Sequence, residues 1–149
     1  MKLKELMNQQ VITIDKTATI IDAAKKMQEF DIGFLPVIFE KQVVGVLTDR
    51  DLVLRGLTNH DPKIDSVMTK DLITIASDCS IEEALILMRE QKIKRILVEE
   101  EKRLVGIISI SDFLRKGIAK EELLETIESI YEISRTTDYY PTEIDEFYL

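Results

Sequence analysis

The hydrophobic pattern switches between a strand-like period and a helical period along most of the chain. Short β-branched runs occur at residues 11–14 (VITI) and 72–75 (LITI), as is typical of strands. Behind each run, apolar residues recur at i, i+3, i+4 and i+7, the spacing of one buried helix face. They are Ile20, Ala23, Ala24 and Met27 in the first case, and Ile81, Ala84, Leu85 and Met88 in the second. The pattern predicts a strand followed by an amphipathic helix, twice.

Hydroxyl side chains mark where both helices begin. Ser80 is followed three residues later by Glu83, which makes a full capping box, and Thr19 is followed by Asp22, which makes a weaker one. We therefore expect Thr19 and Ser80 to be the N-caps.

Two further apolar runs follow each helix. FLPVIF and VVGVL are separated by a polar turn at residues 40–42, and RILVEE and LVGII by one at residues 101–103. Each pair of runs predicts a β-hairpin. A last helix is expected to begin near Asp49 in the first case and near Ser111 in the second.

The two halves are related by an ungapped shift of 61 residues, which aligns Gly45 with Gly106 and Asp51 with Asp112. Such regularity indicates one supersecondary unit used twice, in which neither copy can bury its apolar face alone. We place the first unit at residues 1–60 and the second at residues 61–118. NHDPK is the linker, and the halves should pack on each other.

The chain changes character after Gly117. Residues 119–149 have a helical spacing of apolar residues at first, and they carry nine acids and two bases, a net charge of −7 against −8 for the whole chain. They predict an acidic helical C-terminal extension beside a nearly neutral repeat. Its aromatic residues, which could anchor it to a partner or to its own dimer, are Tyr139, Tyr140, Phe147 and Tyr148.

Composition excludes several classes of protein. At 149 residues and 45% hydrophobic, the chain suits one compact domain or two halves sharing a core. Its acidity opposes nucleic-acid binding. One cysteine, Cys79, and one histidine, His60, exclude a disulfide framework and a Cys/His metal site. Without a long apolar run or signal peptide, we expect a cytoplasmic protein that binds no membrane.

Catalysis is not expected. The sequence has no nucleophile elbow, phosphate-binding P-loop or HExxH motif. His60 lies in the linker, and Cys79 aligns with Ala18, which suggests a small packed side chain rather than a nucleophile. We predict no catalytic residue, no metal and no required cofactor.

The repeated heptads GVLTDRD, at 45–51, and GIISISD, at 106–112, are the candidate chemistry. Taken alone, T-x-x-D and S-x-x-D are most simply helix caps. Three features favour a binding site as well. The glycine permits close backbone approach, a helix N-terminus with a hydroxyl suits an anion, and an Asp can accept hydrogen bonds from the vicinal diol of a ribose.

The doubled unit and its in-register motifs resemble a tandem pair of CBS domains (a Bateman module), over about Leu6 to Ile118. Both heptads fit that family's nucleotide signature, G-h-x-[ST]-x-x-[DN]. The resemblance implies an α+β fold of two pseudo-twofold-related β-α-β-β-α units with facing sheets. It also implies two clefts between the units for an adenosyl ligand such as AMP, ADP, ATP or S-adenosylmethionine.

Carried over residue by residue, the resemblance implies two sets of binding residues. The first cleft would use Asp51 on the ribose, Thr48 on the ribose–phosphate side, and Val46, Leu72, Ile73 and Leu97 around the adenine. The second cleft would use Asp112, Ser109, Ile107, Ile12 and Pro36.

The resemblance also implies that the clefts are unequal. Lys94 and Arg95 begin a strand of the second unit and would direct their charge across to the Asp51 cleft, where Arg50 would add another. Their counterparts, Gly33 and Phe34, are uncharged. We therefore expect the Asp51 cleft to bind phosphorylated ligands more tightly, and the Asp112 cleft to lack a phosphate clamp.

Two functions remain open from the sequence. The first is a regulatory adenine-nucleotide sensor, a homodimer that signals to a protein partner in trans because no catalytic or transport domain is attached. The alternative is a structural or protein-interaction scaffold whose motifs only cap helices.

Overall fold

The computed structural model describes residues 1–136, with side-chain surroundings as far as Tyr131. The aromatic segment that was considered as a docking element, from Tyr139 to Tyr148, lies outside the described residues. No helix within the described part is long and apolar enough to cross a membrane.

The first half contains a 3-10 turn η1 and six further elements. They are η1 (Leu3–Glu5), β1 (Ile14–Asp15), α1 (Ile20–Phe30), β2 (Phe34–Phe39), β3 (Gln42–Thr48), α2 (Asp49–Asp51) and the π-helical turn η2 (Leu52–Gly56). The second half contains η3 (Ile64–Ser66), β4 (Thr74–Ala76), α3 (Ile81–Gln91), β5 (Arg95–Glu100), β6 (Arg103–Ser109), α4 (Ile110–Lys116) and α5 (Lys120–Thr136).

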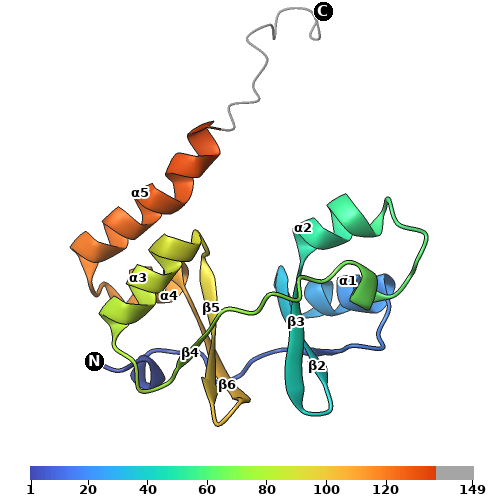
Figure 1. Cartoon of the computed structure of the whole chain (residues 1–149), viewed down its shortest axis with the longest axis horizontal. Coiled ribbons are helices and arrows are strands. Elements are labelled where there is room, and N and C mark those ends of the chain that lie inside the picture. The colour runs from blue at the N-terminus through green and yellow to red at the C-terminus, as the bar shows by residue number, and fades with distance from the viewer. Residues whose placement is uncertain (137–149) are drawn as a thin grey trace, which may run out of the picture.

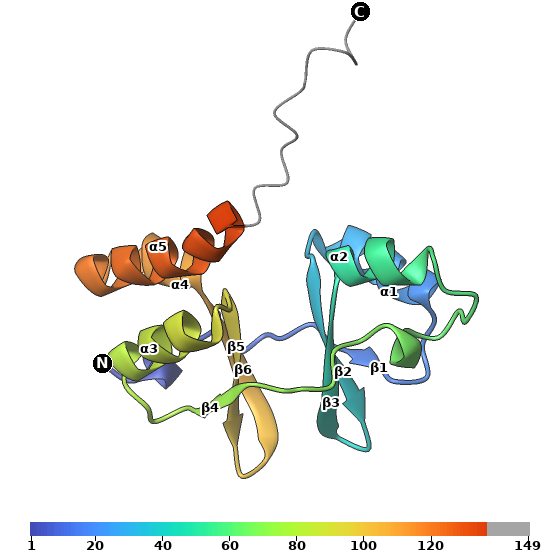
Figure 2. The ribbon, with the colours of Figure 1, turned by 45° about the horizontal axis from the view of Figure 1, so that its top comes forward.

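Each half forms a three-stranded sheet, ordered β1-β2-β3 or β4-β5-β6, with the first pair parallel and the hairpin pair antiparallel. The two sheets stand in the middle of the molecule, and the helices lie on the outer sides (Figures 1 and 2). β3 and β6 lie side by side where the halves meet. The predicted α+β fold of two β-α-β-β-α units is confirmed.

The predicted helix starts and hairpin turns are confirmed in atomic detail. Thr19 caps α1, and its backbone N–H donates to Asp22 at 2.9 Å, which together with the Thr19 hydroxyl holds the pKa of Asp22 below its ordinary value. The turn residues Glu40 and Lys41 both have positive φ angles, as do Glu101 and Lys102. Two successive positive φ angles fit the right-handed twist of a tight hairpin.

The first strands are shorter than the β-branched runs suggested, and a proline explains the difference between them. β4 begins at Thr74, opposite Leu97, whereas β1 begins one position later, at Ile14. The residue opposite Thr13 is Pro36, the equivalent of Leu97. Proline has no N–H to donate to the ladder, so β1 loses its first pair. Residues 11–13 run on as extended chain.

Strand alternation separates the helix-side cores from the surface between the sheets. Leu35 and Val37 of β2 point into a core with α1, and the corresponding Ile96 and Val98 of β5 point into a core with α3. The intervening residues, Pro36 and Leu97, are buried but belong to neither core. They therefore lie on the inner faces of the sheets.

A short segment precedes the first strand of each half, residues 3–8 in the first and 64–69 in the second. Each of these lead-in segments packs on the other half. Leu3 and Leu6 are buried in the core of the second unit, while Ile64 and Val67 are buried in the core of the first. Backbone bridges fix both segments: Asn8 pairs with Ile107, and Thr69 pairs with Val46. Each sheet thus receives a crossing segment that precedes the other half in sequence.

Gly45 and Gly106 allow these crossings. A Cβ at Gly45 would lie 2.6 Å from the Met68 sulfur and 3.0 Å from the Thr69 carbonyl oxygen, and one at Gly106 would lie 2.5 Å from the Met7 sulfur. Close backbone approach at these glycines was expected, and it is present. The approaching group is the chain's own lead-in segment.

We predict that Gly45→Ala destabilises the protein by about 1–3 kcal/mol, because the new methyl group must displace Met68 and the backbone of Thr69. Urea unfolding of the variant and the wild type measures the loss. Gly56→Ala serves as a comparison, since its Cβ would meet only Ile20, at 3.3 Å or more. If Gly45→Ala is as stable as the wild type, the segment around Met68 and Thr69 can move away from the new methyl group at no cost in free energy.

Candidate functional site: the clefts between the halves

A cleft of about 520 Å³ opens between the two halves beside Asp112. Its walls combine the β6–α4 junction with chain from the first unit. The lining residues are Asn8, Gln10, Val11, Ile12, Asp31, Ile32, Gly33, Phe34, Pro36, Arg95, Ile107, Ser109, Ser111, Asp112 and Arg115. All five residues that the sequence assigned to this cleft, from both halves, are among them. Their role in binding a ligand stays a prediction.

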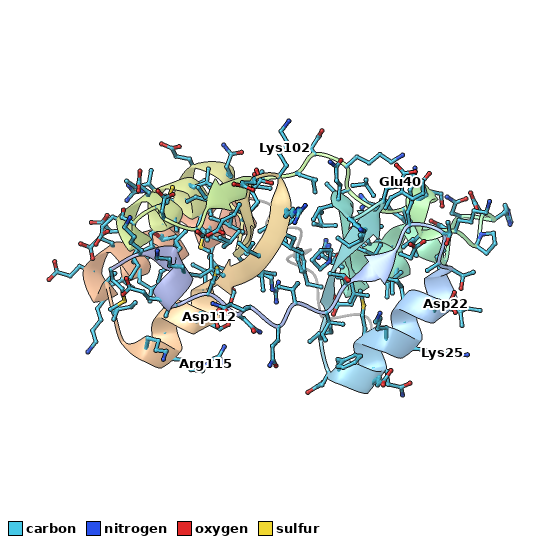
Figure 3. The ribbon with its side chains drawn as sticks, turned by 90° about the horizontal axis from the view of Figure 1, so that it is seen from below. Asp22, Lys25, Glu40, Lys102, Asp112 and Arg115 are labelled. Carbon is cyan, nitrogen blue, oxygen red and sulfur yellow. The ribbon has the colours of Figure 1, made fainter. Side chains whose placement is uncertain are left out.

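The polar end of this cleft is built where β6 turns into α4. The Ser109 backbone N–H and hydroxyl both donate to Asp112 Oδ2, at 2.8 and 2.6 Å, and Arg115 Nη2 pairs with Asp112 Oδ1 at 2.9 Å. Figure 3 shows Asp112, from the first turn of α4, and Arg115, from its last turn, near each other. A carboxylate, a hydroxyl and a guanidinium can hydrogen-bond a diol and an anion side by side.

Arg95, at the start of β5, also lines the Asp112 cleft. Its guanidinium carbon lies 5.6 Å from the centre of the Phe34 ring, a cation–π distance. Phe34 and Arg95 occupy the same position in the two repeats, so their contact lies on the pseudo-twofold axis.

The expectation that the Asp112 cleft lacks a basic clamp is therefore wrong. Arg95 lines this cleft because β5 pairs it directly with Ser109 in the same sheet, which brings it to the cleft of its own half. Arg115, which is not among the predicted site residues, adds a second guanidinium.

Lys94 also lies elsewhere than expected. Its ammonium nitrogen is 4.6 Å from the centre of the Tyr131 ring of α5. Successive side chains of an extended chain point to opposite sides, so Lys94 faces the helices while Arg95 faces the cleft. The two charges do not form one clamp.

The Asp51 motif has a similar carboxylate arrangement. Thr48 N–H donates to Asp51 Oδ2 at 2.9 Å, and Arg55 Nη2 pairs with Oδ1 at 2.7 Å. Arg55 is tied down further by bonds to the Val67 carbonyl oxygen, at 3.1 Å from Nε and 2.8 Å from Nη2. Its side chain is 51% exposed, whereas that of Arg115 is 73% exposed. Arg115 is thus the freer of the two guanidinium groups.

The remaining residues assigned to the Asp51 cleft lie in several parts of the fold. Val46 pairs with Thr69 of the crossing segment, and Leu72 and Ile73 are half-buried just before β4. Leu97 is buried on the inner face of β5. Arg50 is exposed in the first turn of α2. Their binding roles remain predictions.

Arg55 and Arg115 were missed because the repeat does not align them. The 61-residue shift places Lys116, not Arg115, opposite Arg55. Asp51 reaches Arg55 at i+4 where the chain enters the wider π turn of η2, whereas Asp112 reaches Arg115 at i+3 within an α-helix. The available signal was an arginine within one turn of each motif aspartate.

The cleft's donor set does not suit a metal ion. Within residues 1–136 no cluster of three His, Cys, Asp or Glu side chains is placed to bind one. The two cationic groups favour an anionic ligand instead.

Comparison with known proteins agrees with this arrangement. The model of the CBS domain matches residues 3–57 and 64–118. The chain is 36% identical over 116 residues to the uncharacterized protein YlbB of Bacillus subtilis (strain 168), covering 74% of this chain and 78% of that protein.

Solved structures are similar over the same region. An uncharacterized conserved protein from Pyrococcus horikoshii is 33% identical with a TM-score of 0.71, over 78% of this chain and 92% of that one. The CBS domain pair of protein MJ0100, solved in complex with 5′-methylthioadenosine and S-adenosyl-L-methionine, is 27% identical with a TM-score of 0.72, over 80% of this chain and 98% of that one. With two matched domains that together form most of its length, the chain belongs to the CBS domain family.

Proposed function

We propose that this protein is a regulatory adenine-nucleotide sensor, which binds an AMP-, ADP- or ATP-type ligand between its two CBS units and signals to a protein partner in trans. One observation carries the proposal. The Asp112 cleft gathers a ribose-type acceptor, a hydroxyl and two guanidinium groups from one half, and apolar residues from the other.

Each part of an adenine nucleotide has a counterpart in the cleft. Asp112 and Ser109 suit the ribose hydroxyls, and Ile12, Pro36 and Ile107 offer an apolar slot for the base. Arg95 and Arg115 suit the phosphates. The adenosyl compounds bound to the related MJ0100 pair support the base and ribose part of this assignment. The two arginines favour a phosphorylated ligand over a neutral one.

A ligand in this position can regulate. Because the cleft is made by both halves, its occupation favours one placement of the halves relative to each other, and a partner with differential affinity for that placement would respond. We infer a regulatory rather than a catalytic role. A homodimer working in the cytoplasm completes the proposal.

A scaffold role is the second candidate, and one observation favours it. The acid of each motif already accepts a hydrogen bond from the backbone N–H of the motif's own Thr48 or Ser109, and it pairs with an arginine. The motifs therefore have a complete structural use as helix starts without any ligand.

We predict that AMP raises the melting temperature of the wild type, because a ligand selective for the folded state stabilises it. Asp112→Asn should weaken AMP binding about tenfold or more, since it removes a charged partner of the ribose, and Asp51→Asn should cause a smaller loss. Isothermal titration calorimetry measures both. Equal losses would contradict the preference for the Asp112 cleft, and no thermal shift with any adenosyl compound would favour the scaffold.

A second prediction separates phosphate recognition from base recognition. Arg95→Ala should weaken AMP binding about tenfold to a hundredfold, as expected for a charge-assisted contact of roughly 1.5–3 kcal/mol, and should change adenosine binding little. Lys25→Ala is the matched control, because Lys25 is an exposed cation on α1 that does not line the cleft. If adenosine and AMP lose affinity equally, Arg95 supports the fold of the cleft rather than the phosphate.

A further inference from the structure

Helix α5 covers the helical face of the second unit only. It lies alongside α3 and also contacts α4 (Figures 1 and 2). Leu123, Thr126 and Ile130 form its buried stripe, and the Thr126 hydroxyl donates to the Glu122 carbonyl oxygen of its own helix at 2.7 Å. α5 is thus a packed part of the second unit rather than a free extension.

Three cations of the second unit contact this helix. Arg89 pairs with Glu125 at 2.9 Å, Lys92 donates to the Ser129 carbonyl oxygen at 2.8 Å and to its hydroxyl, and Lys94 lies over the Tyr131 ring. Their equivalents in the first unit, by the 61-residue shift, are Gln28, Asp31 and Gly33. The first unit therefore has none of the charges that hold α5.

The same short stretch of chain also serves the cleft. Arg95 follows Lys94 directly but faces the opposite side, where it lines the cleft with Asp112 and Arg115. Arg115 belongs to α4, which packs against α5. Neighbouring basic residues of the second unit thus face opposite sides, Lys94 towards α5 and Arg95 towards the cleft.

α5 is strongly acidic on its exposed surface. Between residues 120 and 131 it has one base, Lys120, and four exposed acids, which are Glu121, Glu122, Glu125 and Glu128. Phosphate groups bound by Arg95 would bring further negative charge close to Lys94, which faces the acidic helix. The negative charges on the two sides of this pair of cations repel each other.

From this geometry we propose that docking of α5 and binding of an anionic ligand in the Asp112 cleft disfavour each other. The bound ligand loosens α5, and docked α5 lowers the affinity of the cleft for the ligand. The inference rests on the proposed function and adds the regulation of the same cleft. Because coupling between two sites is reciprocal, both effects correspond to the same coupling free energy. Release of α5 on ligand binding exposes the apolar stripe of α3 and α4, which gives the sensor an output surface.

The first test measures α5 itself. Hydrogen–deuterium exchange of the full chain, with and without AMP, should show faster exchange of the amides of residues 120–131 when AMP is bound, because a loosened helix opens more often. Adenosine, which has no charge, should leave this exchange unchanged. Binding of AMP with unchanged or slower exchange in α5 would overturn the inference and leave the nucleotide sensor intact.

The second test measures the reciprocal effect. The double variant Glu125→Gln/Glu128→Gln should bind AMP about two- to fivefold more tightly than the wild type at low ionic strength, and the gain should shrink in high salt. Both side chains are exposed, so the fold is not at risk. Glu29→Gln/Glu40→Gln, which removes two exposed acids of the first unit, is the control and should leave AMP affinity unchanged.

Adenosine distinguishes charge from packing. An equal gain in adenosine affinity for the Glu125→Gln/Glu128→Gln variant would show that α5 acts on the shape of the cleft, and would overturn the electrostatic coupling. If calorimetry detects binding of neither AMP nor adenosine to the wild type, the proposed function fails and the coupling fails with it.

Discussion

The architecture depends on the exchange of the two lead-in segments. Leu3 and Leu6 complete the core of the second unit, and Ile64 and Val67 complete the core of the first. Each segment crosses a motif strand at the glycine, where no side chain would fit. Both motif strands are held in place from across the molecule, so the clefts between the halves keep their shape only while both cores are intact.

The two clefts differ because the symmetry of the repeat is broken at the pseudo-twofold axis. Identical residues there would make equal clefts, but the pair is Phe34 and Arg95, stacked on each other. The Phe34 ring is uncharged, whereas the Arg95 guanidinium brings a positive charge to the Asp112 cleft. Three more cations on the second unit hold α5 on that side alone. The repeat supplies the fold, and the differences between its copies make the two halves chemically unequal.

Much of the fold could be predicted from the sequence, because caps, hairpins and the repeat are local or periodic signals. All five residues assigned to the Asp112 cleft do line it. Lys94 and Arg95 were assigned to the Asp51 cleft, but Lys94 faces α5 and Arg95 lines the Asp112 cleft. The sequence alone does not show to which side the residues at the start of a strand point. Arg115 was missed because the repeat register does not match it with Arg55. The exchanged segments are too short to have a detectable period.

The exchange also shapes how the chain can fold. Leu3 precedes the whole repeat in the sequence, yet its core contains Phe113 and Leu123, which are synthesised more than a hundred positions later. Contacts of such long sequence separation slow folding. Leu3 and Leu6 stay uncovered until nearly the whole repeat has been synthesised. Either half made alone would lack one wall of its own core, so the pair is the smallest unit that can reach the native state.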